Sequence, residues 1–411
     1  MGKLITFHTP VLKMQTTKKK KIKVIRIINR FNIGGPTYNA TFLTRYLSDD
    51  FETLLLGGLP EKDESDSLYI LDQYNVTPHL IKEMKRKPSL VSDVQAFLKI
   101  RKLMRKFQPD IVHTHASKAG VLGRLAAISL GIPIVIHTFH GHVFHSYFSS
   151  LKTLLFKTTE RFFAKKSTAI IAISPIQKEE LVHVHKIVAS SKCIVLPLGF
   201  DLIRFKIKKE EARQEIRTQY GISRDAIAVA IVGRLAPIKN HRMFLDATRL
   251  VAEQTNVKCM FFIVGDGSEY DWIAEEVSEL NDRFSDMHWV MTSWIKDIAT
   301  FNAGMDLICL TSTNEGTPVS LIEAQASGVA ILATDVGGVR DCVNVGVTAI
   351  LSPSNDTEKF ASSLLELVEN EKKREFLSQN GWTHVKESFH YTRLVNDMDK
   401  LYRKLVHENR V

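Results

Sequence analysis

Short continuous runs of β-branched and other apolar residues alternate with longer segments of helical periodicity along this chain. A continuous apolar run of this kind is typical of a strand that is buried on both faces of a parallel sheet. The first half contains six such runs, at residues 24–29, 53–58, 110–115, 132–141, 169–174 and 193–199. Strands that alternate with helices predict a doubly wound α/β domain.

The alternation begins again in the second half, with six further runs at residues 226–235, 258–267, 287–293, 306–312, 330–338 and 349–354. We therefore predict two Rossmann-like domains, an N-terminal one at residues 21–197 and a C-terminal one at residues 198–387. Ligands bind beyond the carboxyl ends of the strands in open parallel sheets. Two sheets that face each other would place the site in a central cleft.

The two ends of the chain lie outside this pattern. Residues 1–20 have no periodicity and are expected to form a flexible basic tail. They hold no apolar core of the length that a secretory signal needs, and no run elsewhere approaches the ~20 residues of a membrane span. We expect a cytoplasmic protein, with a C-terminal helix at about residues 388–411 that packs back on the first domain.

Charge is distributed unevenly between the two halves. The 411 residues carry a net charge of +10, but residues 1–200 hold 30 basic and 14 acidic residues and residues 201–411 are net acidic. The apolar share of 44% and charged share of 24% are those of a soluble globular protein, which excludes a disordered or collagen-like chain. The asymmetry predicts an anionic partner for the first domain, such as nucleic acid, anionic lipid or a phosphorylated substrate.

The segment LTSTNEGTPVSLIEAQASG (310–328) has the strongest chemical pattern. A strand ends near Ser312, and Gly316 leads to a predicted N-cap at Thr317 with Pro318 as the first helical residue. The free amides of Val319 and Ser320 would then form a natural phosphate site. Two acids flank this helix start, Glu315 on the loop and Glu323 about two turns into the helix, suited to paired hydroxyls. The alternative is a surface helix with incidental acids.

Three other loops carry weaker signals. VGRLAPIKN (232–240) brings Arg234 and Lys239 to a strand end, which suits a diphosphate, although basic loop residues are usually just solvated. VGDG (264–267) is a strand-ending turn around Gly265. NIGGPT (32–37) lets the backbone approach a ligand at Gly34 and Gly35, but it lacks the spacing of a dinucleotide fingerprint.

Together these segments resemble the retaining, nucleotide-sugar-dependent glycosyltransferases of family 4, which have the GT-B fold. The resemblance covers the chain from about Lys23, and its most specific element is the pair of glutamates separated by seven residues in EGTPVSLIE. GRLAPIKN, VGDG, SWIKDI (293–298), DVGGVRD (335–341) and PLGFDLIRF (197–205) support it, because they occur in the family's order.

The resemblance implies a role for each site residue. Arg234 and Lys239 would hold the donor diphosphate, Glu315 would contact the donor sugar, and Glu323 would hold the ribose hydroxyls. The remaining expected contacts are the glycine loop with the phosphates, His140 of HTFHGH with the sugar, and Trp294 beside the base, where a core role is equally open. The donor is expected to be a UDP-sugar, with no cofactor and no catalytic metal. Retention would follow from attack on the same face as the leaving group.

Six histidines crowd the first domain, at positions 113, 115, 137, 140, 142 and 145. Histidine is a common metal ligand, but no Cys or Asp cluster accompanies them, so a structural role or a sugar contact by His140 is favoured over a metal site. His113 and His115 share a strand face and are expected to line the acceptor pocket.

The acceptor is expected on the basic first domain. The helix at 97–107 places apolar residues on one face and Lys99, Lys102, Arg105 and Lys106 on the other. We expect the apolar face to pack on the sheet and the basic face to attract anionic headgroups without insertion. The predicted reaction moves a hexose or N-acetylhexosamine to a polyprenyl-diphosphate-linked saccharide or other glycan, at the inner face of the plasma membrane, in polysaccharide biosynthesis.

Three alternatives remain open. A nucleotide-sugar 2-epimerase has the same fold, but the paired glutamates argue against it. An inactive nucleotide-binding partner subunit would have the same motifs but would not catalyse sugar transfer. Nucleic-acid binding fits the sequence pI of about 9.2, but the chain has no aromatic RNA-binding strand motif and no helix-turn-helix.

Overall fold

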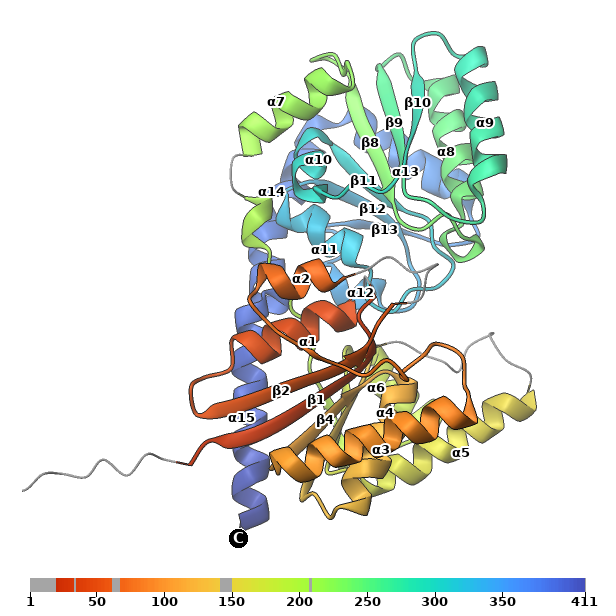
Figure 1. The fold of residues 1–411 in the computed structure, drawn as a ribbon. Helices are drawn as coiled ribbons and strands as arrows, with labels where there is room; N and C mark the ends of the chain where they lie inside the picture. The colour runs from red at the N-terminus through yellow and green to blue at the C-terminus, as the bar shows by residue number, and fades with distance from the viewer. Residues whose placement is uncertain (1–19, 33–34, 61–66, 141–149, 207–208, 411) are drawn as a thin grey trace, which may run out of the picture.

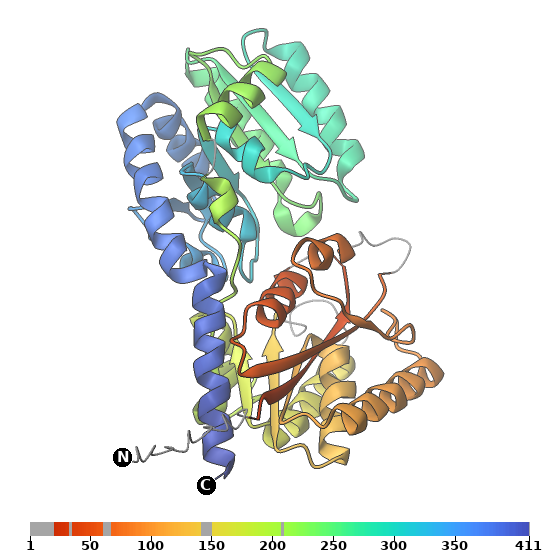
Figure 2. The ribbon, with the colours of Figure 1, turned by 60° about the vertical axis from the view of Figure 1, so that its left-hand side comes forward.

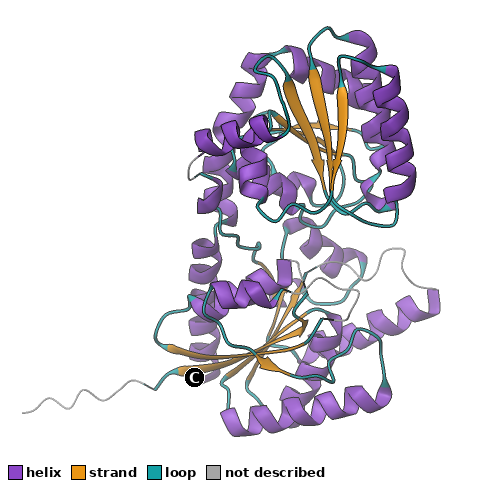
Figure 3. Cartoon of the chain, turned by 45° about the horizontal axis from the view of Figure 1, so that its top comes forward, coloured by secondary structure: helices purple, strands orange, loops and turns teal. Residues whose placement is uncertain are grey.

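Two parallel β-sheets, each covered by helices on both faces, make up the molecule (Figures 1 and 3). The structure is a computed structural model and describes residues 20–32, 35–60, 67–140, 150–206 and 209–410. This architecture confirms the predicted GT-B-like arrangement of two Rossmann-like units. The tail at residues 1–19 and Gly34 lie outside the described residues.

The first sheet has the strand order β3-β2-β1-β4-β5-β6-β7, with every described pair parallel. Its strands are β1 (Ile22–Arg30), β2 (Phe51–Gly58), β3 (His79–Leu80), β4 (Ile111–His115), β5 (Ile134–Phe139), β6 (Ala169–Ala172) and β7 (Cys193–Val195). The helices between them are α1 (Gly35–Arg45), α2 (Leu68–Gln73), α3 (Leu90–Phe107), α4 (Ser117–Ser129), α5 (Ser150–Lys166) and α6 (Pro175–Glu179).

The second sheet has the order β10-β9-β8-β11-β12-β13 and is also parallel. Its strands are β8 (Ile227–Val232), β9 (Cys259–Val264), β10 (His288–Thr292), β11 (Leu307–Leu310), β12 (Ala330–Thr334) and β13 (Ile350–Ser352). The helices that follow the linker are α7 (Lys209–Gln219), α8 (His241–Gln254), α9 (Tyr270–Arg283), α10 (Ile298–Gly304), α11 (Val319–Ala326), α12 (Val339–Cys342), α13 (Thr357–Glu369), α14 (Glu371–Phe389) and α15 (Tyr391–Arg410).

The central strands are buried along their whole length, as the continuous apolar runs predicted. Every residue of β4, β5, β11 and β12 is buried. Helices on both faces remove these side chains from water, which is the main stabilising contribution of such a sheet. All twelve predicted strands are present. The sequence analysis missed β3, because its two residues are exposed and carry no apolar run.

The chain crosses between the two sheets twice, and the two crossings run side by side. Phe200 in the linker forms a parallel bridge with His390, between α14 and α15. The Phe200 amide donates to the Phe389 carbonyl, and the Tyr391 amide donates to the Phe200 carbonyl. After this crossing, α15 runs along the first sheet (Figure 2).

Helix α15 completes the core of the first unit. Its buried face, which includes Leu394, Met398 and Leu405, belongs to the same apolar cluster as Val24 and Ile111 of the sheet. One polar contact inside this packing is fully buried. The Tyr402 hydroxyl accepts from Arg26 Nη2 at 3.1 Å and lies 2.6 Å from His113 Nδ1.

These contacts fix the hydrogen positions in the buried network. Arginine can only donate, so the Tyr402 hydroxyl proton is directed at His113 Nδ1. His113 Nε2 then carries the ring proton and donates to Thr138 Oγ1, 2.7 Å away. Burial lowers the pKa of His113 well below its usual value, which agrees with this neutral tautomer.

Replacing Tyr402 with Phe should destabilise the protein by about 1–3 kcal/mol, because Arg26 and His113 each lose a buried partner. Urea unfolding of the two proteins measures this loss. Tyr270→Phe is the matched control, since Tyr270 is exposed and should lose almost nothing. An equal loss in both variants would contradict the importance of the buried network.

Candidate functional site

Four loops at the carboxyl edge of the second sheet pack backbone against backbone. Gly265, after β9, has φ +145°, and a Cβ there would lie 1.9 Å from the Gly233 carbonyl oxygen. Gly338, after β12, is held in the same way, since its Cβ would lie 1.7 Å from the Gly316 carbonyl oxygen. The Gly338 amide also donates to the Glu315 carbonyl. Only glycine permits these approaches, so the loops after β8, β9, β11 and β12 form one rigid surface.

Two of the predicted site residues meet on this surface. Lys239 Nζ lies 2.5 Å from Glu315 Oε1, and the same oxygen accepts from Ser312 Oγ at 2.6 Å. Both charged side chains are mostly buried. The Thr311 hydroxyl, which donates to the Lys239 carbonyl, ties the two loops together. The pair therefore brings a fixed cation and a fixed carboxylate to the strand ends.

Arg234 lies on the same loop as Lys239 but points into solvent. It is exposed and forms no hydrogen bond or ion pair with the described residues. A guanidinium without a protein partner keeps all its donors available for an anion. The structure thus separates the two predicted cations into one that is paired with Glu315 and one that is free for a ligand.

The start of helix α11 differs from the prediction. Pro318 is the N-cap residue and the helix begins at Val319, without a side-chain cap. The expected N-cap at Thr317 is therefore wrong, because the Thr317 hydroxyl lies buried with no hydrogen-bond partner among the described residues. Glu323 lies four residues after the helix start, about one turn into the helix and not the two that were expected. The amides of Val319 and Ser320 remain in the first turn, where a helix has no internal acceptors for them.

Glu323 is held at the edge of the site in an unusual environment. Its side chain is 16% exposed, and its ionic partner among the described residues is Arg204, 3.5 Å away. Burial raises the pKa of Glu323 to about 7, and the Arg204 guanidinium opposes this rise. The carboxyl group therefore changes its charge near neutral pH.

Two other predicted contacts have a definite place. Gly35 begins α1, and a Cβ there would lie 3.2 Å from Leu198 Cδ1 of the linker, so it faces the region between the sheets. Trp294 follows β10 and is 54% exposed, which rules out the core role and leaves its ring accessible to a ligand.

The histidines of the first unit are mostly internal. His113, His115 and His137 are fully buried, so the expectation that the first two line an acceptor pocket is wrong. They fill the sheet interior because β4 and β5 are covered on both faces. His142 and His145 lie outside the described residues.

His140 sits at the end of β5 and is only partly buried. Its Nε2 lies 2.8 Å from His115 Nδ1, so one ring donates and the other accepts. Burial lowers the pKa of His140 to about 3, which makes it a neutral group at physiological pH. Within the described residues, no three His, Cys, Asp or Glu side chains are grouped so that they could hold a metal ion.

Two residues beside the site were not predicted from the sequence. They are Arg204, which contacts Glu323, and Tyr74, whose hydroxyl donates to Asp201 at 2.9 Å. Both contacts join residues more than 100 positions apart. The only available signal was the pair of charged residues inside the otherwise apolar linker PLGFDLIRF. In the part of the chain that the structure describes, no helix has the length and apolar character needed to span a membrane.

Comparisons with known proteins agree with this geometry. A model described as glycosyl transferases group 1 matches residues 212–384, and one described as Glycosyltransferase Family 4 matches residues 33–204. The Escherichia coli UDP-Gal:alpha-D-GlcNAc-diphosphoundecaprenol alpha-1,3-galactosyltransferase is 30% identical over 340 residues, which are 81% of this chain and 85% of that protein. The chain belongs to glycosyltransferase family 4.

A second relative of this glycosyltransferase and a solved structure each match most of the chain. The capsular polysaccharide biosynthesis glycosyltransferase CapM of Staphylococcus aureus is 26% identical over 345 residues, covering 82% of this chain and 88% of CapM. The crystal structure of Anabaena HepE in complex with UDP has a TM-score of 0.76 at 19% identity, and the match covers 93% of this chain and all of that one. The structural likeness confirms the GT-B fold.

Replacing Lys239 with Ala in the glycosyltransferase should lower turnover by roughly 10²–10³, the scale for removing a group that stabilises developing charge. It should also cost about 1–3 kcal/mol of stability, because Glu315 is left buried without its counter-charge. Arg234→Ala should lower turnover similarly but leave the unfolding free energy unchanged, since Arg234 has no hydrogen-bond or ionic partner among the described residues.

Steady-state kinetics and urea unfolding of both variants separate these effects. Lys359→Ala, at an exposed position on α13, is the control for loss of a lysine. Near-native turnover of both the Lys239 and the Arg234 variant at saturating donor would show that the diphosphate does not bind here.

Proposed function

We propose that this glycosyltransferase is a retaining enzyme that transfers a hexose or N-acetylhexosamine from a UDP-sugar to a polyprenyl-diphosphate-linked saccharide. The observation that carries the proposal is the Lys239–Glu315 pair, fixed between the glycine loops beside the first turn of α11. This arrangement offers positive charge for a diphosphate and a carboxylate for sugar hydroxyls. Arg234, Gly265 and the amides of Val319 and Ser320 would add further donors for the phosphates.

The proposed reaction depends on stabilising the leaving group. As the bond between the anomeric carbon and the phosphate oxygen breaks, negative charge grows on the diphosphate, next to Lys239, Arg234 and the start of α11. The acceptor oxygen forms the new bond on the same face, and its proton passes to the leaving phosphate oxygen. No protein nucleophile is needed, because the acceptor oxygen itself forms the new bond. Glu315, which accepts hydrogen bonds from Lys239 and Ser312, would orient the sugar.

Other described residues complete the proposed donor site. Glu323 would bind the ribose hydroxyls, Trp294 would border the base, and Gly35 would let the first domain approach the phosphates. His140, neutral at the end of β5, would contact the sugar from the acceptor side. The UDP in the HepE crystal structure and the UDP-galactose in the name of the E. coli relative support a uridine nucleotide.

The proposed acceptor is supported by the names of two relatives. One acts on a diphosphoundecaprenol-linked sugar, and another belongs to capsular polysaccharide biosynthesis. A polyprenyl chain stays in the bilayer, so an enzyme that uses it must work at the membrane surface. We therefore propose a peripheral protein at the inner face of the plasma membrane.

Helix α3 offers a suitable surface for this contact. Its buried face packs Ile100 and Met104 on the sheet, as the sequence predicted. The opposite face exposes an apolar stripe over its first half and a cationic stripe over its second, comprising Leu90, Val91, Val94 and Leu98, then Lys102, Arg105 and Lys106. The exposed apolar half replaces the expectation of docking without insertion: we propose that it enters the headgroup region while the cationic half binds anionic lipid.

A panel of nucleotide sugars with a synthetic polyprenyl-diphosphate N-acetylhexosamine tests the chemistry. UDP-sugars should support transfer, and the anomeric configuration of the product, read by NMR, should match that of the donor. Transfer only from sugars of another nucleotide would contradict the donor, and an inverted product would contradict retention. Hydrolysis without transfer to the lipid would contradict the acceptor.

Co-sedimentation of the whole protein with vesicles tests the membrane surface. Binding should require anionic lipid and fall as salt rises, because screening acts over a Debye length of about 8 Å at physiological salt. Replacing the four apolar residues of the stripe with Ser, or the three cationic ones with Gln, should each weaken binding severalfold. A charge-matched control replaces Lys359, Lys372 and Lys386 of the second domain, which are exposed. Binding that is unchanged in all variants would contradict the assigned surface.

A further inference from the structure

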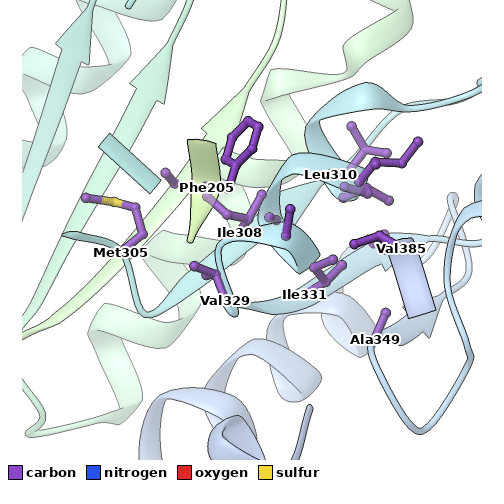
Figure 4. Close-up of a cluster of buried hydrophobic side chains, with 14 of the residues drawn as sticks. Phe205, Met305, Ile308, Leu310, Val329, Ile331, Ala349 and Val385 are labelled. Atoms are coloured by element: carbon purple, nitrogen blue, oxygen red, sulfur yellow. The ribbon is translucent and has the colours of Figure 1, made fainter. Parts of the chain in front are cut away.

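The linker between the two domains is anchored in the core of the second one. Leu202 and Phe205 belong to the large apolar cluster that also holds Ile308 and Leu310 of β11 (Figure 4). Both linker side chains are fully or almost fully buried. The short 3-10 turn at Ile203–Phe205 therefore has a fixed position against the sheet that carries the site.

Two charged side chains of this anchored segment point in different directions. Asp201 accepts a hydrogen bond from Tyr74, at the end of α2 in the first domain, at 2.9 Å. Arg204 instead reaches Glu323 of the second domain, with Nη2 at 3.5 Å from Oε1. Phe205 lies under the Arg204 guanidinium, 4.9 Å from its centre to the ring centroid, and supports its orientation.

Among the residues that the structure describes, few charged groups face Glu323. Besides Arg204, the interacting group is the hydroxyl of Tyr38 on α1, and burial raises the pKa of Tyr38 far above neutrality. Tyr38 therefore stays uncharged, and Arg204 is the cation that favours an ionised Glu323. An ionised carboxylate accepts hydrogen bonds from two hydroxyls, whereas a protonated one has less acceptor capacity.

We propose that Arg204 is a positioning residue for the donor: it holds Glu323 ionised and oriented in the empty enzyme, and gives the carboxylate up to the ribose hydroxyls when the nucleotide binds. The proposal rests on the proposed function, because it takes the ligand of Glu323 to be the ribose. The weakness of the contact favours such an exchange. Arg204 is 42% exposed and the 3.5 Å separation is long for an ion pair, so its loss costs little.

The test is the pH dependence of UDP binding, measured by calorimetry between pH 5.5 and 9. In the native protein the UDP affinity should fall as the pH drops through about 7, where Glu323 takes up a proton. In Arg204→Ala the ionised form loses its cation, so the midpoint should move upward by about half a pH unit, and UDP should bind about twofold more weakly at pH 7. Arg204→Lys should recover part of this loss.

Two further variants serve as controls. Glu323→Gln cannot titrate at this position, so its profile shows the titration of UDP itself and of all other groups. Tyr74→Phe removes the other polar tie of the linker without touching Glu323, and should keep the native midpoint. A general loosening of the linker would instead shift both the Tyr74 and the Arg204 variant.

The outcomes separate this inference from the proposed function. A native midpoint in Arg204→Ala, with UDP still bound through Glu323, overturns the role of Arg204 alone. Failure of UDP to bind the native protein at any pH overturns the donor assignment itself. A midpoint that persists in Glu323→Gln shows that another group titrates, and also overturns the inference.

Discussion

Parallel strands in one sheet all end at the same edge, and the rest of this structure depends on that constraint. In the second domain it brings the loops after β8, β9, β11 and β12 together, although they are separated by up to about 100 residues in the chain. The glycines at 265 and 338 then let these loops touch backbone to backbone. A rigid edge of this kind holds Lys239 and Glu315 in fixed positions relative to each other.

The fold could be predicted from the sequence because its signal is local and repeated. A strand such as 307–310 is apolar throughout since it is covered on both faces, and the same rule applies at each repeat. The positions of Glu315 and Arg234 on loops at strand ends could be predicted in the same way, because each loop carries its own sequence pattern. The prediction failed at Thr317, because the cap position depends on where the loop is held by Gly338, a contact from another strand.

Long-range contacts account for what the sequence could not show. The sequence pattern of His113 and His115 suggests residues that line a pocket. In the structure, Tyr402 of α15, almost 300 residues later, contacts His113, and the His115 ring packs against the His113 ring. The importance of Arg204 likewise comes from its contact with Glu323, which lies on a different element. In each case the local sequence pattern predicts the strand or helix on which the residue lies. It does not predict the side chain that the residue contacts, because that contact is set by tertiary packing.

Helix α15 has a consequence for how the protein is made. The core of the first domain contains Val24 near its beginning and Leu405 near the end of α15, and the whole second domain is synthesised between them. Until α15 has been synthesised, the sheet of the first domain therefore has an uncovered apolar face. Arg26 also lacks its hydrogen-bond partner Tyr402 during that time. The two domains are separate in space, but they are not two successive folding units.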